Sequence, residues 1–393
     1  MEGGPLGNYQ GLSYNMKIKN FNIPDFGRIF TNDELGDSKL SLDLYQKSYD
    51  LCKKDMDEED IEVADLILKC LDENSSLPFD ISPQEKIFLE SNDLEKWCEY
   101  LVFRYKLKKY PEQRKVSKFP CYLLIEPVSA CNLRCVMCFQ IDKTFTKKPY
   151  MGVMPMDLYK KVVDQAVAGG TRAITLASRG EPLMHKQICE MLDYAKGKFF
   201  EIKINTNATK MTEEHCHAIL SSNVTELVFS IDAERKDLYE RIRVRGKFDT
   251  VVDNIKMFHS IREKHYPNSN TMTTASGVFF DEEQSIEKYT KFFQKLVDNV
   301  AVVNIENRWN TYANETHPDI TSPCEYLWQR MYVWFDGISN PCDVDYKSYL
   351  EVGNLNNSTI KEIWSGETYN ALRKDHISGS RSKWNPCDRC GLS

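Results

Sequence analysis

The cysteines with the most informative spacing are Cys131, Cys135 and Cys138, which are separated by three and then two residues. They follow residues 122–127, an apolar stretch typical of a strand, so we expect them on the loop at its carboxyl end. Three thiolates on one loop can hold a cubane iron-sulfur cluster and leave one iron without a protein ligand. An open coordination position is typical of catalytic metal centres. The alternative is a zinc site that takes its fourth ligand from a distant residue.

A second group of cysteines lies near the end of the sequence. Cys324 and Cys342 have Gly337 between them, and Cys387 and Cys390 are separated by two residues. Two pairs of thiolates can enclose one site, and their spacing fits zinc as well as an iron-sulfur cluster. Chelation by four cysteines would also stabilise a loop-rich tail.

Composition narrows the class of protein. The chain has 393 residues, 13 cysteines and a net charge of -7, with no secretory pattern and no apolar run of membrane-spanning length. We therefore predict a cytoplasmic protein of two to three domains with no nucleic-acid or membrane partner. In a reducing compartment, clustered cysteines bind metals or act in catalysis more often than they form disulfides.

Elements that could position the first cysteine group begin near residue 120. Short apolar stretches alternate with amphipathic ones, which is typical of a parallel sheet built from βα units. The predicted strands are residues 122–127, 172–177, 200–205, 225–231, 271–279 and 300–305. The predicted helices are residues 156–168, 186–197, 213–222, 249–264 and 286–298. Loops at the carboxyl ends of parallel strands meet on one side of the sheet, where we expect the site.

The parts on either side of this core differ from it. The first hundred or so residues are predicted to be helical and acidic, and Ser82 to Glu85 has the pattern of a capping box. An acidic, solvated helical face explains this charge more simply than a docking surface. After Trp309 the alternation ends and a cysteine-containing tail follows. We predict three domains, at residues 1–118, 119–310 and 311–393.

The first cysteine group resembles the Cys-x3-Cys-x-(bulky)-Cys loop of the radical S-adenosylmethionine (radical SAM) enzymes, with Met137 as the bulky residue. The resemblance implies a partial (β/α)6 barrel, and a [4Fe-4S] cluster on Cys131, Cys135 and Cys138 whose open iron binds SAM. One electron then cleaves SAM to a 5′-deoxyadenosyl radical that removes a hydrogen atom from the substrate. In such enzymes the cofactor carries the radical chemistry, and the protein supplies positioning and excludes water.

Further stretches fit the same family in the expected order. Residues 178–182 are similar to the Gly-Gly-Glu-Pro motif that binds the SAM amino group, with Arg179 in place of the first glycine. Residues 205–208 resemble the family's Thr-Asn-Gly turn, and Arg243 lies where relatives pair an arginine with the SAM carboxylate. The residues that the resemblance assigns to SAM binding are Met137, Phe139, Arg179, Gly180, Glu181, Pro182, Asn207, Ser230, Asp232 and Arg243.

The second cysteine group resembles the auxiliary-cluster domain of the SPASM and twitch subfamilies. No cysteine follows Cys390, so the shortened twitch form is the better match. The resemblance implies one auxiliary [4Fe-4S] cluster, held by Cys324, Cys342, Cys387 and Cys390.

Candidates for substrate contact come from strand ends. Asn304, Glu306 and Arg308 would share one face of the last predicted strand, and Glu126 ends the first beside the cysteine loop. We predict catalytic roles for Glu126, Glu306 and Arg308. Asp343 and Asp345 are further candidates, and a salt bridge or a surface position is the alternative for all of these residues.

The predicted function is hydrogen abstraction from a small polar metabolite, such as a sugar, aminocyclitol or nucleotide-sugar, with oxidation or epimerisation as the outcome. Epimerisation needs a hydrogen donor, and the spare core thiols of Cys121, Cys189 and Cys216 are not at carboxyl ends of strands, so oxidation is favoured. The resemblance implies an electron donor such as flavodoxin or ferredoxin. The alternatives are a maturase that modifies a peptide or protein and, least supported, a non-catalytic cluster scaffold.

Overall fold

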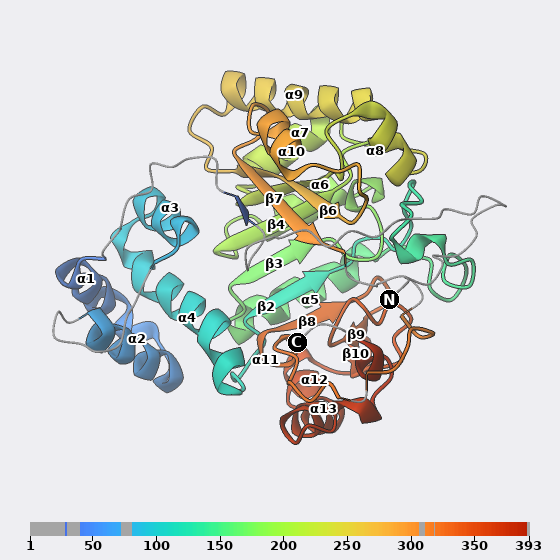
Figure 1. Ribbon diagram of the computed structural model, residues 1–393. Helices are drawn as coiled ribbons and strands as arrows, with labels where there is room; N and C mark the ends of the chain where they lie inside the picture. The colour runs from blue at the N-terminus through green and yellow to red at the C-terminus, as the bar shows by residue number, and fades with distance from the viewer. Residues whose placement is uncertain (1–27, 30–39, 72–80, 306–310, 318, 391–393) are drawn as a thin grey trace.

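The computed structural model describes residues 28–29, 40–71, 81–305, 311–317 and 319–390. A ten-stranded sheet runs through these residues in the order β1-β7-β6-β5-β4-β3-β2-β8-β9-β10. Figure 1 shows the N-terminal helices at one end of this sheet and the C-terminal segment beside β2.

Six neighbouring strands of the sheet run parallel, as predicted. They are β2 (Tyr122–Ile125), β3 (Ala173–Leu176), β4 (Glu201–Thr206), β5 (Glu226–Ser230), β6 (Met272–Phe279) and β7 (Asn299–Asn304). Each coincides with a predicted strand to within two residues at either end, and the α/β class with six parallel strands is confirmed. Buried parallel strands have nearly continuous apolar sequences, which explains why the sequence identified them.

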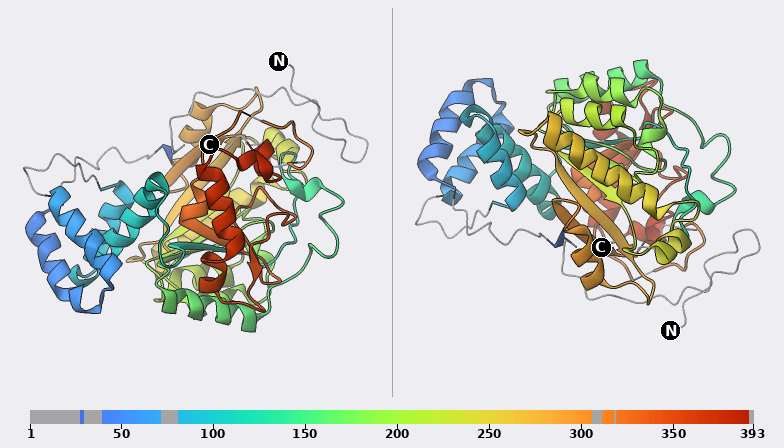
Figure 2. Two further views of the ribbon diagram at one scale, coloured as in Figure 1. Left: turned by 90° about the horizontal axis from the view of Figure 1, so that it is seen from below. Right: turned by 90° about the horizontal axis from the view of Figure 1, so that it is seen from above.

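Helices connect these strands and cover the outer face of the sheet (Figure 2). They are α5 (Met156–Gly169), α6 (Ile188–Ala195), α7 (Glu213–Ser221), α8 (Lys236–Ile242), α9 (Phe248–His265) and α10 (Ile286–Phe293). The predicted helix over residues 286–298 ends early, at Phe293. Asp298 instead accepts hydrogen bonds from the backbone and hydroxyl of Thr273, which holds the chain at the start of β6.

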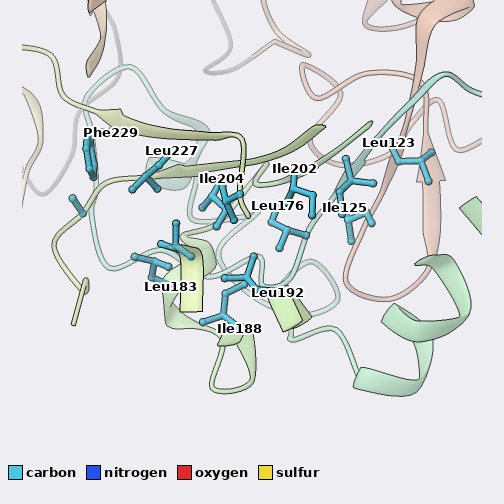
Figure 3. Packing of buried hydrophobic residues seen from close by; sticks show 14 of the residues in the cluster. Leu123, Ile125, Leu176, Leu183, Ile188, Leu192, Ile202, Ile204, Leu227 and Phe229 are labelled. Atoms are coloured by element: carbon cyan, nitrogen blue, oxygen red, sulfur yellow. The ribbon is translucent and has the colours of Figure 1, made fainter. Parts of the chain in front are cut away.

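The core lies between the strands and these helices. Leu123 and Ile125 of β2 and Ile202 and Ile204 of β4 pack with Leu192 of α6, and each is at most 2% exposed (Figure 3). Alternate strand residues point to the opposite face, so that face forms the interior that opens at the carboxyl ends.

The N-terminal part is mainly helical in the described residues between 40 and 113. It contains α1 (Leu42–Cys52), α2 (Glu58–Leu71), α3 (Pro83–Ser91) and α4 (Trp97–Gln113). The predicted capping box is present, because the Ser82 and Glu85 side chains each accept the other residue's backbone N–H. Tyr100 and Arg104 of α4 donate hydrogen bonds to Glu201 at 2.9 and 3.1 Å. The N-terminal helices therefore pack at the amino end of β4, opposite the predicted site.

The C-terminal segment continues the sheet, which the sequence did not predict. Strand β8 (Arg330–Val333) pairs in parallel with β2, and β9 (Ile338–Asn340) and β10 (Gly353–Asn354) follow in antiparallel pairing. Strand β1 (Arg28–Ile29) pairs with the other side of the sheet, antiparallel to β7. The C-terminal helices are α11 (Tyr326–Gln329), α12 (Ile360–Trp364) and α13 (Glu367–Ile377). None of the described helices combines the length and apolarity that crossing a membrane requires.

Candidate active site

A cavity of about 500 Å³ opens at the carboxyl ends of the parallel strands. Its walls come from the first cysteine loop, the loop after β3, the ends of β4 to β7, and the C-terminal segment. Most of the residues that the sequence assigned to SAM binding line it: Met137, Phe139, Arg179, Gly180, Glu181, Asn207, Ser230 and Arg243. The structure therefore brings the predicted motifs together in one place.

The first cysteine loop directs three thiols into this cavity. Burial, the nearby Glu181 carboxylate and the Cys138 thiol together raise the pKa of Cys131 to about 12. Bound iron would reverse this shift, because a metal stabilises the thiolate. The Cys131 sulfur accepts the Leu133 N–H at 3.4 Å, as thiolate ligands commonly do. The chemistry and placement of these thiols fit an iron-sulfur cluster.

The loop after β3 packs directly against the first cysteine loop. Gly180 has no room for a side chain, because a Cβ atom would lie 2.1 Å from the Val128 carbonyl oxygen. The Glu181 N–H donates to the Ala130 carbonyl at 3.0 Å, and Pro182 begins the short 3₁₀ helix η4 (Pro182–Met184). These contacts fix the Glu181 carboxylate beside the cysteines.

Glu181 is 3% exposed and lines the cavity. Its carboxylate accepts three hydrogen bonds, from the Thr206 hydroxyl at 2.6 Å and the N–H groups of Asn207 and Leu183 at 2.7 and 3.1 Å. Burial nevertheless raises its pKa, because these bonds do not fully replace water. An ammonium group in the cavity would stabilise the ionised form.

Arg243 provides the opposite charge. Arg243 is buried, and burial by itself lowers the pKa of its guanidinium. The nearby Asp232 carboxylate has the larger effect and holds the pKa of Arg243 well above its usual value. Asp232 also accepts the Val278 N–H at 2.9 Å, which fixes the pair to β6. Asp232 and Pro182 are not among the described residues that line the cavity, and the structure shows Asp232 as the ion-pair partner of Arg243. The arginine remains available for a carboxylate.

Glu126 and Arg179 form a buried ion pair. The guanidinium donates to both carboxylate oxygens at 2.6 and 2.7 Å, and the two side chains are at most 2% exposed. Glu126 also accepts the N–H groups of Arg179 and Phe335. Since both oxygens are already bonded, this arrangement matches the salt-bridge alternative for Glu126 more closely than a catalytic one. The other two predicted catalytic residues, Glu306 and Arg308, lie outside the described residues.

The second cysteine group also converges. Burial and Asp343 raise the pKa of Cys342, and the thiols of Cys390, Cys324 and Cys387 raise it further. This mutual effect requires the four sulfurs to lie near one another. The Arg381 side chain links the group by donating to the Ser322 and Cys390 carbonyl oxygens at 3.0 and 3.2 Å. Gly337, with φ of 86°, makes the turn between β8 and β9 that leads to Cys342.

Within the described ranges, no three His, Cys, Asp or Glu side chains are close enough to hold a single metal ion. A cubane cluster binds its thiolates to different irons and therefore needs a wider arrangement. The zinc alternatives for both groups receive no support, and both groups fit iron-sulfur clusters.

Three polar side chains of the cavity wall were not predicted as site residues. The Gln140 Oε1, Ser178 Oγ and Asn205 Oδ1 atoms are buried and have no hydrogen-bond partner among the residues that the structure describes. Ser178 also has φ of 122°, which is strained for a residue with a side chain. Strand alternation could have identified Asn205, since it shares the inward face of β4 with Lys203.

Residues 125–292 match the Radical SAM superfamily, and residues 324–391 match SPASM, an iron-sulfur cluster-binding domain. The chain therefore contains a radical SAM domain followed by a SPASM domain. These domains imply SAM and a [4Fe-4S] cluster in the first and an auxiliary iron-sulfur cluster in the second. Both matches fall on the parts of the fold that contain the two cysteine groups.

Curated relatives match parts of the chain. A tungsten-containing aldehyde ferredoxin oxidoreductase cofactor-modifying protein from Pyrococcus furiosus is 33% identical over 28% of this chain and 30% of its own length. An AdoMet-dependent heme synthase from Methanosarcina barkeri is 23% identical over 59% of this chain and 62% of its own length. The chain thus spans less than two thirds of the length of these relatives.

Solved radical SAM structures share the fold. SuiB from Streptococcus suis, bound to precursor peptide SuiA, superposes with a TM-score of 0.54 and 17% identity over 88% of this chain and 83% of that chain. The protein anSMEcpe with bound AdoMet gives a TM-score of 0.51 and 16% identity over 68% of this chain and 87% of that chain.

Proposed function

We propose that this protein is a radical SAM enzyme that abstracts a hydrogen atom from a small polar metabolite (a sugar, aminocyclitol or nucleotide-sugar) and oxidises it. When bound, the cluster and SAM supply a 5′-deoxyadenosyl radical. The observation that carries the proposal is the convergence of three cysteines, Glu181 and Arg243 on one cavity. We also propose a cytoplasmic location, since no disulfide joins any of the cysteines in the described residues, and a reductant such as flavodoxin or ferredoxin.

The chain's own residues would orient SAM by charge. Glu181 is suited to the ammonium group and Arg243 to the carboxylate of its methionine part. Both side chains are buried and fixed by hydrogen bonds, so little freedom is lost when SAM binds. The Asn207 amide donates to the Asn132 side chain at 3.2 Å and lies within 3.7 Å of the Cys131 sulfur, which connects this wall to the first cysteine loop.

The unpartnered oxygens of Ser178 and Asn205 support a polar substrate. A buried acceptor without a partner is costly, so it favours a ligand that donates hydrogen bonds. Hydroxyl and ammonium groups are such donors. A cavity of about 500 Å³ also suits small molecules.

The positions of the spare thiols favour oxidation over epimerisation. Cys189 lies on α6, Cys216 is buried in α7, and Cys121 precedes β2 at the opposite end of the strands. Among the described residues, the only thiols that line the cavity are those of Cys131, Cys135 and Cys138. Epimerisation needs a thiol as a hydrogen donor, whereas oxidation needs an acceptor for the electron that the substrate radical loses together with a proton. A cluster held by Cys324, Cys342, Cys387 and Cys390 would supply that acceptor.

A peptide or protein maturase is the second candidate. One observation that favours it is the similarity to a serine-type anaerobic sulfatase-maturating enzyme from Bacteroides thetaiotaomicron, which is 28% identical over 45% of this chain. Another is that the superposition with peptide-bound SuiB covers 88% of this chain. In that case the N-terminal helices would be the docking element. Apart from β1, however, the described N-terminal part is helical and offers no strands for pairing with a peptide.

The test is release of 5′-deoxyadenosine by the anaerobically reconstituted, reduced protein with SAM. We expect pooled sugars and nucleotide-sugars to stimulate release and pooled peptides to leave it unchanged. Cys135→Ala should abolish release, and the matched control Cys216→Ala should retain it. Stimulation by peptides alone would favour the maturase, and no SAM cleavage under any condition would refute the proposal.

A further inference from the structure

A buried contact joins the loop after β3 to the second cysteine group. We call residues 178–182 the SAM loop and residues 342–350 the Cys342 loop. The Arg179 Nη1 atom donates to the Tyr346 carbonyl oxygen at 3.0 Å, while its Nε and Nη2 atoms donate to Glu126. The guanidinium also lies over the Trp334 ring, 4.2 Å from its centroid. The Arg179 side chain therefore connects the SAM loop to the Cys342 loop, and its charge is paired with Glu126.

Arg179 is held rigidly in this position. Its backbone N–H donates to Glu126 at 3.2 Å, and its carbonyl accepts from the Gln140 amide at 2.6 Å. Gln140 follows the first cysteine group, and its amide also donates to the Ser129 carbonyl. The backbone of Arg179 is thus fixed to the first cysteine loop, and only its side chain reaches the second group.

The Cys342 loop has a second attachment, to the segment after Cys138. The Tyr346 ring stacks on Phe139 with centroids 4.8 Å apart, and its hydroxyl donates to Asp142 at 3.0 Å. Lys347 forms an ion pair with the same carboxylate at 2.7 Å. These contacts attach the Cys342 loop to the segment that follows the first cysteine group.

We propose that Arg179 is a positioning residue that couples the order of the Cys342 loop to the SAM loop. Bidentate pairing with Glu126 fixes the guanidinium plane, so movement of the SAM loop is transmitted to the Tyr346 carbonyl. Coupling between two sites is reciprocal, so ligand binding at the SAM loop should order the Cys342 loop. A glycine, which the Gly-Gly-Glu-Pro resemblance leads us to expect at this position, could not form the contact. The loop's assignment to SAM rests on the proposed function.

The test is hydrogen–deuterium exchange of the full, anaerobically reconstituted chain with and without SAM. The reporters are the Tyr349 and Leu350 amides, which donate to Asp345 at 2.9 and 2.7 Å. In the unmodified protein we expect SAM to slow exchange in both loops. The double variant Glu126→Gln with Arg179→Met removes both charges together, so no buried charge is left unpaired.

In the double variant we expect exchange of residues 345–350 to be about tenfold faster and to be independent of SAM. Arg179→Lys keeps a charge for Glu126 but has no second nitrogen group to reach Tyr346, so it should behave in the same way. The matched control, Lys203→Met with Glu226→Gln, removes an ion pair of 2.9 Å between β4 and β5 and should leave the Cys342 loop unchanged.

Unchanged exchange of residues 345–350 in the double variant, or normal behaviour of Arg179→Lys, would overturn the coupling. If the proposed function itself is wrong, SAM will slow exchange in neither loop of the unmodified protein. Even then, faster exchange of residues 345–350 in the variants without SAM would show that the contact between Arg179 and Tyr346 orders the Cys342 loop. The two failures are therefore distinguishable.

Discussion

Glu181→Gln is the substitution that tests the SAM site most directly. The Glu181 carboxylate accepts hydrogen bonds from three donors: the Thr206 hydroxyl, the Asn207 N–H and the Leu183 N–H. A glutamine amide must direct its NH2 group toward at least one of these donors. The substitution therefore removes the negative charge and also loses a buried hydrogen bond.

The expected magnitude follows from these contacts. A hydrogen bond to a charged group contributes about 1.5–3 kcal/mol, and the variant loses such a bond to the SAM ammonium group. Because the amide oxygen compensates in part, we expect SAM binding to weaken by about 1.5–2 kcal/mol, or about 10- to 30-fold in Kd. The iron content should not change, because Glu181 is not a thiolate ligand.

Equilibrium binding of SAM to the anaerobically reconstituted protein measures this effect. Thr206→Val is the matched control, since it removes one donor to Glu181 and leaves the charge in place. It should weaken binding by about 1 kcal/mol, or about fivefold. A Glu181→Gln protein with the original Kd and iron content would refute the reasoning, as would a larger effect from Thr206→Val.

Three further predictions follow from the cavity and the cysteines. Asn205→Leu should leave SAM binding intact but weaken the binding of a hydroxylated substrate by about 1–2 kcal/mol, measured as a rise in KM. The reason is that the substitution removes the Asn205 side-chain oxygen, which could accept a hydrogen bond from the substrate. Cys342→Ala should lower the iron content from about eight to about four atoms per chain, measured by iron analysis. The control variant Cys216→Ala should keep the original iron content. Gly180→Ala should lower the melting temperature and SAM affinity together, because the added methyl group meets the Val128 carbonyl and overpacking costs about 1–3 kcal/mol.

Local sequence patterns were sufficient for the strands and most helices. Each parallel strand is an apolar run, and α5 and α9 are long enough to show helical periodicity. Helix α8 has only seven residues, and β8 has four within a cysteine-containing segment, so neither shows a clear period. Their positions depend on tertiary packing.

The cavity was predictable in outline, because motifs at successive strand ends must meet. The partner of each charged side chain was not. Glu126 and Arg179 are 53 residues apart, and Arg179 and Tyr346 are 167 apart. Asp232 was predicted as a SAM-binding residue, but its ion pair with Arg243 was not predicted. Charge pairs over such separations depend on the completed fold and leave no periodic signal.

The pairing of β8 with β2 determines how the two cysteine groups are connected. Backbone hydrogen bonds between these strands make the second group part of the same sheet as the first, so their separation is set by strand register and not by a linker. A chain that ended before β8 would expose β2 as an unprotected edge strand, with Tyr122 to Ile125 open to pairing with other molecules. The barrel therefore cannot be isolated by truncation without a risk of aggregation, and its SAM site is best studied in the full chain.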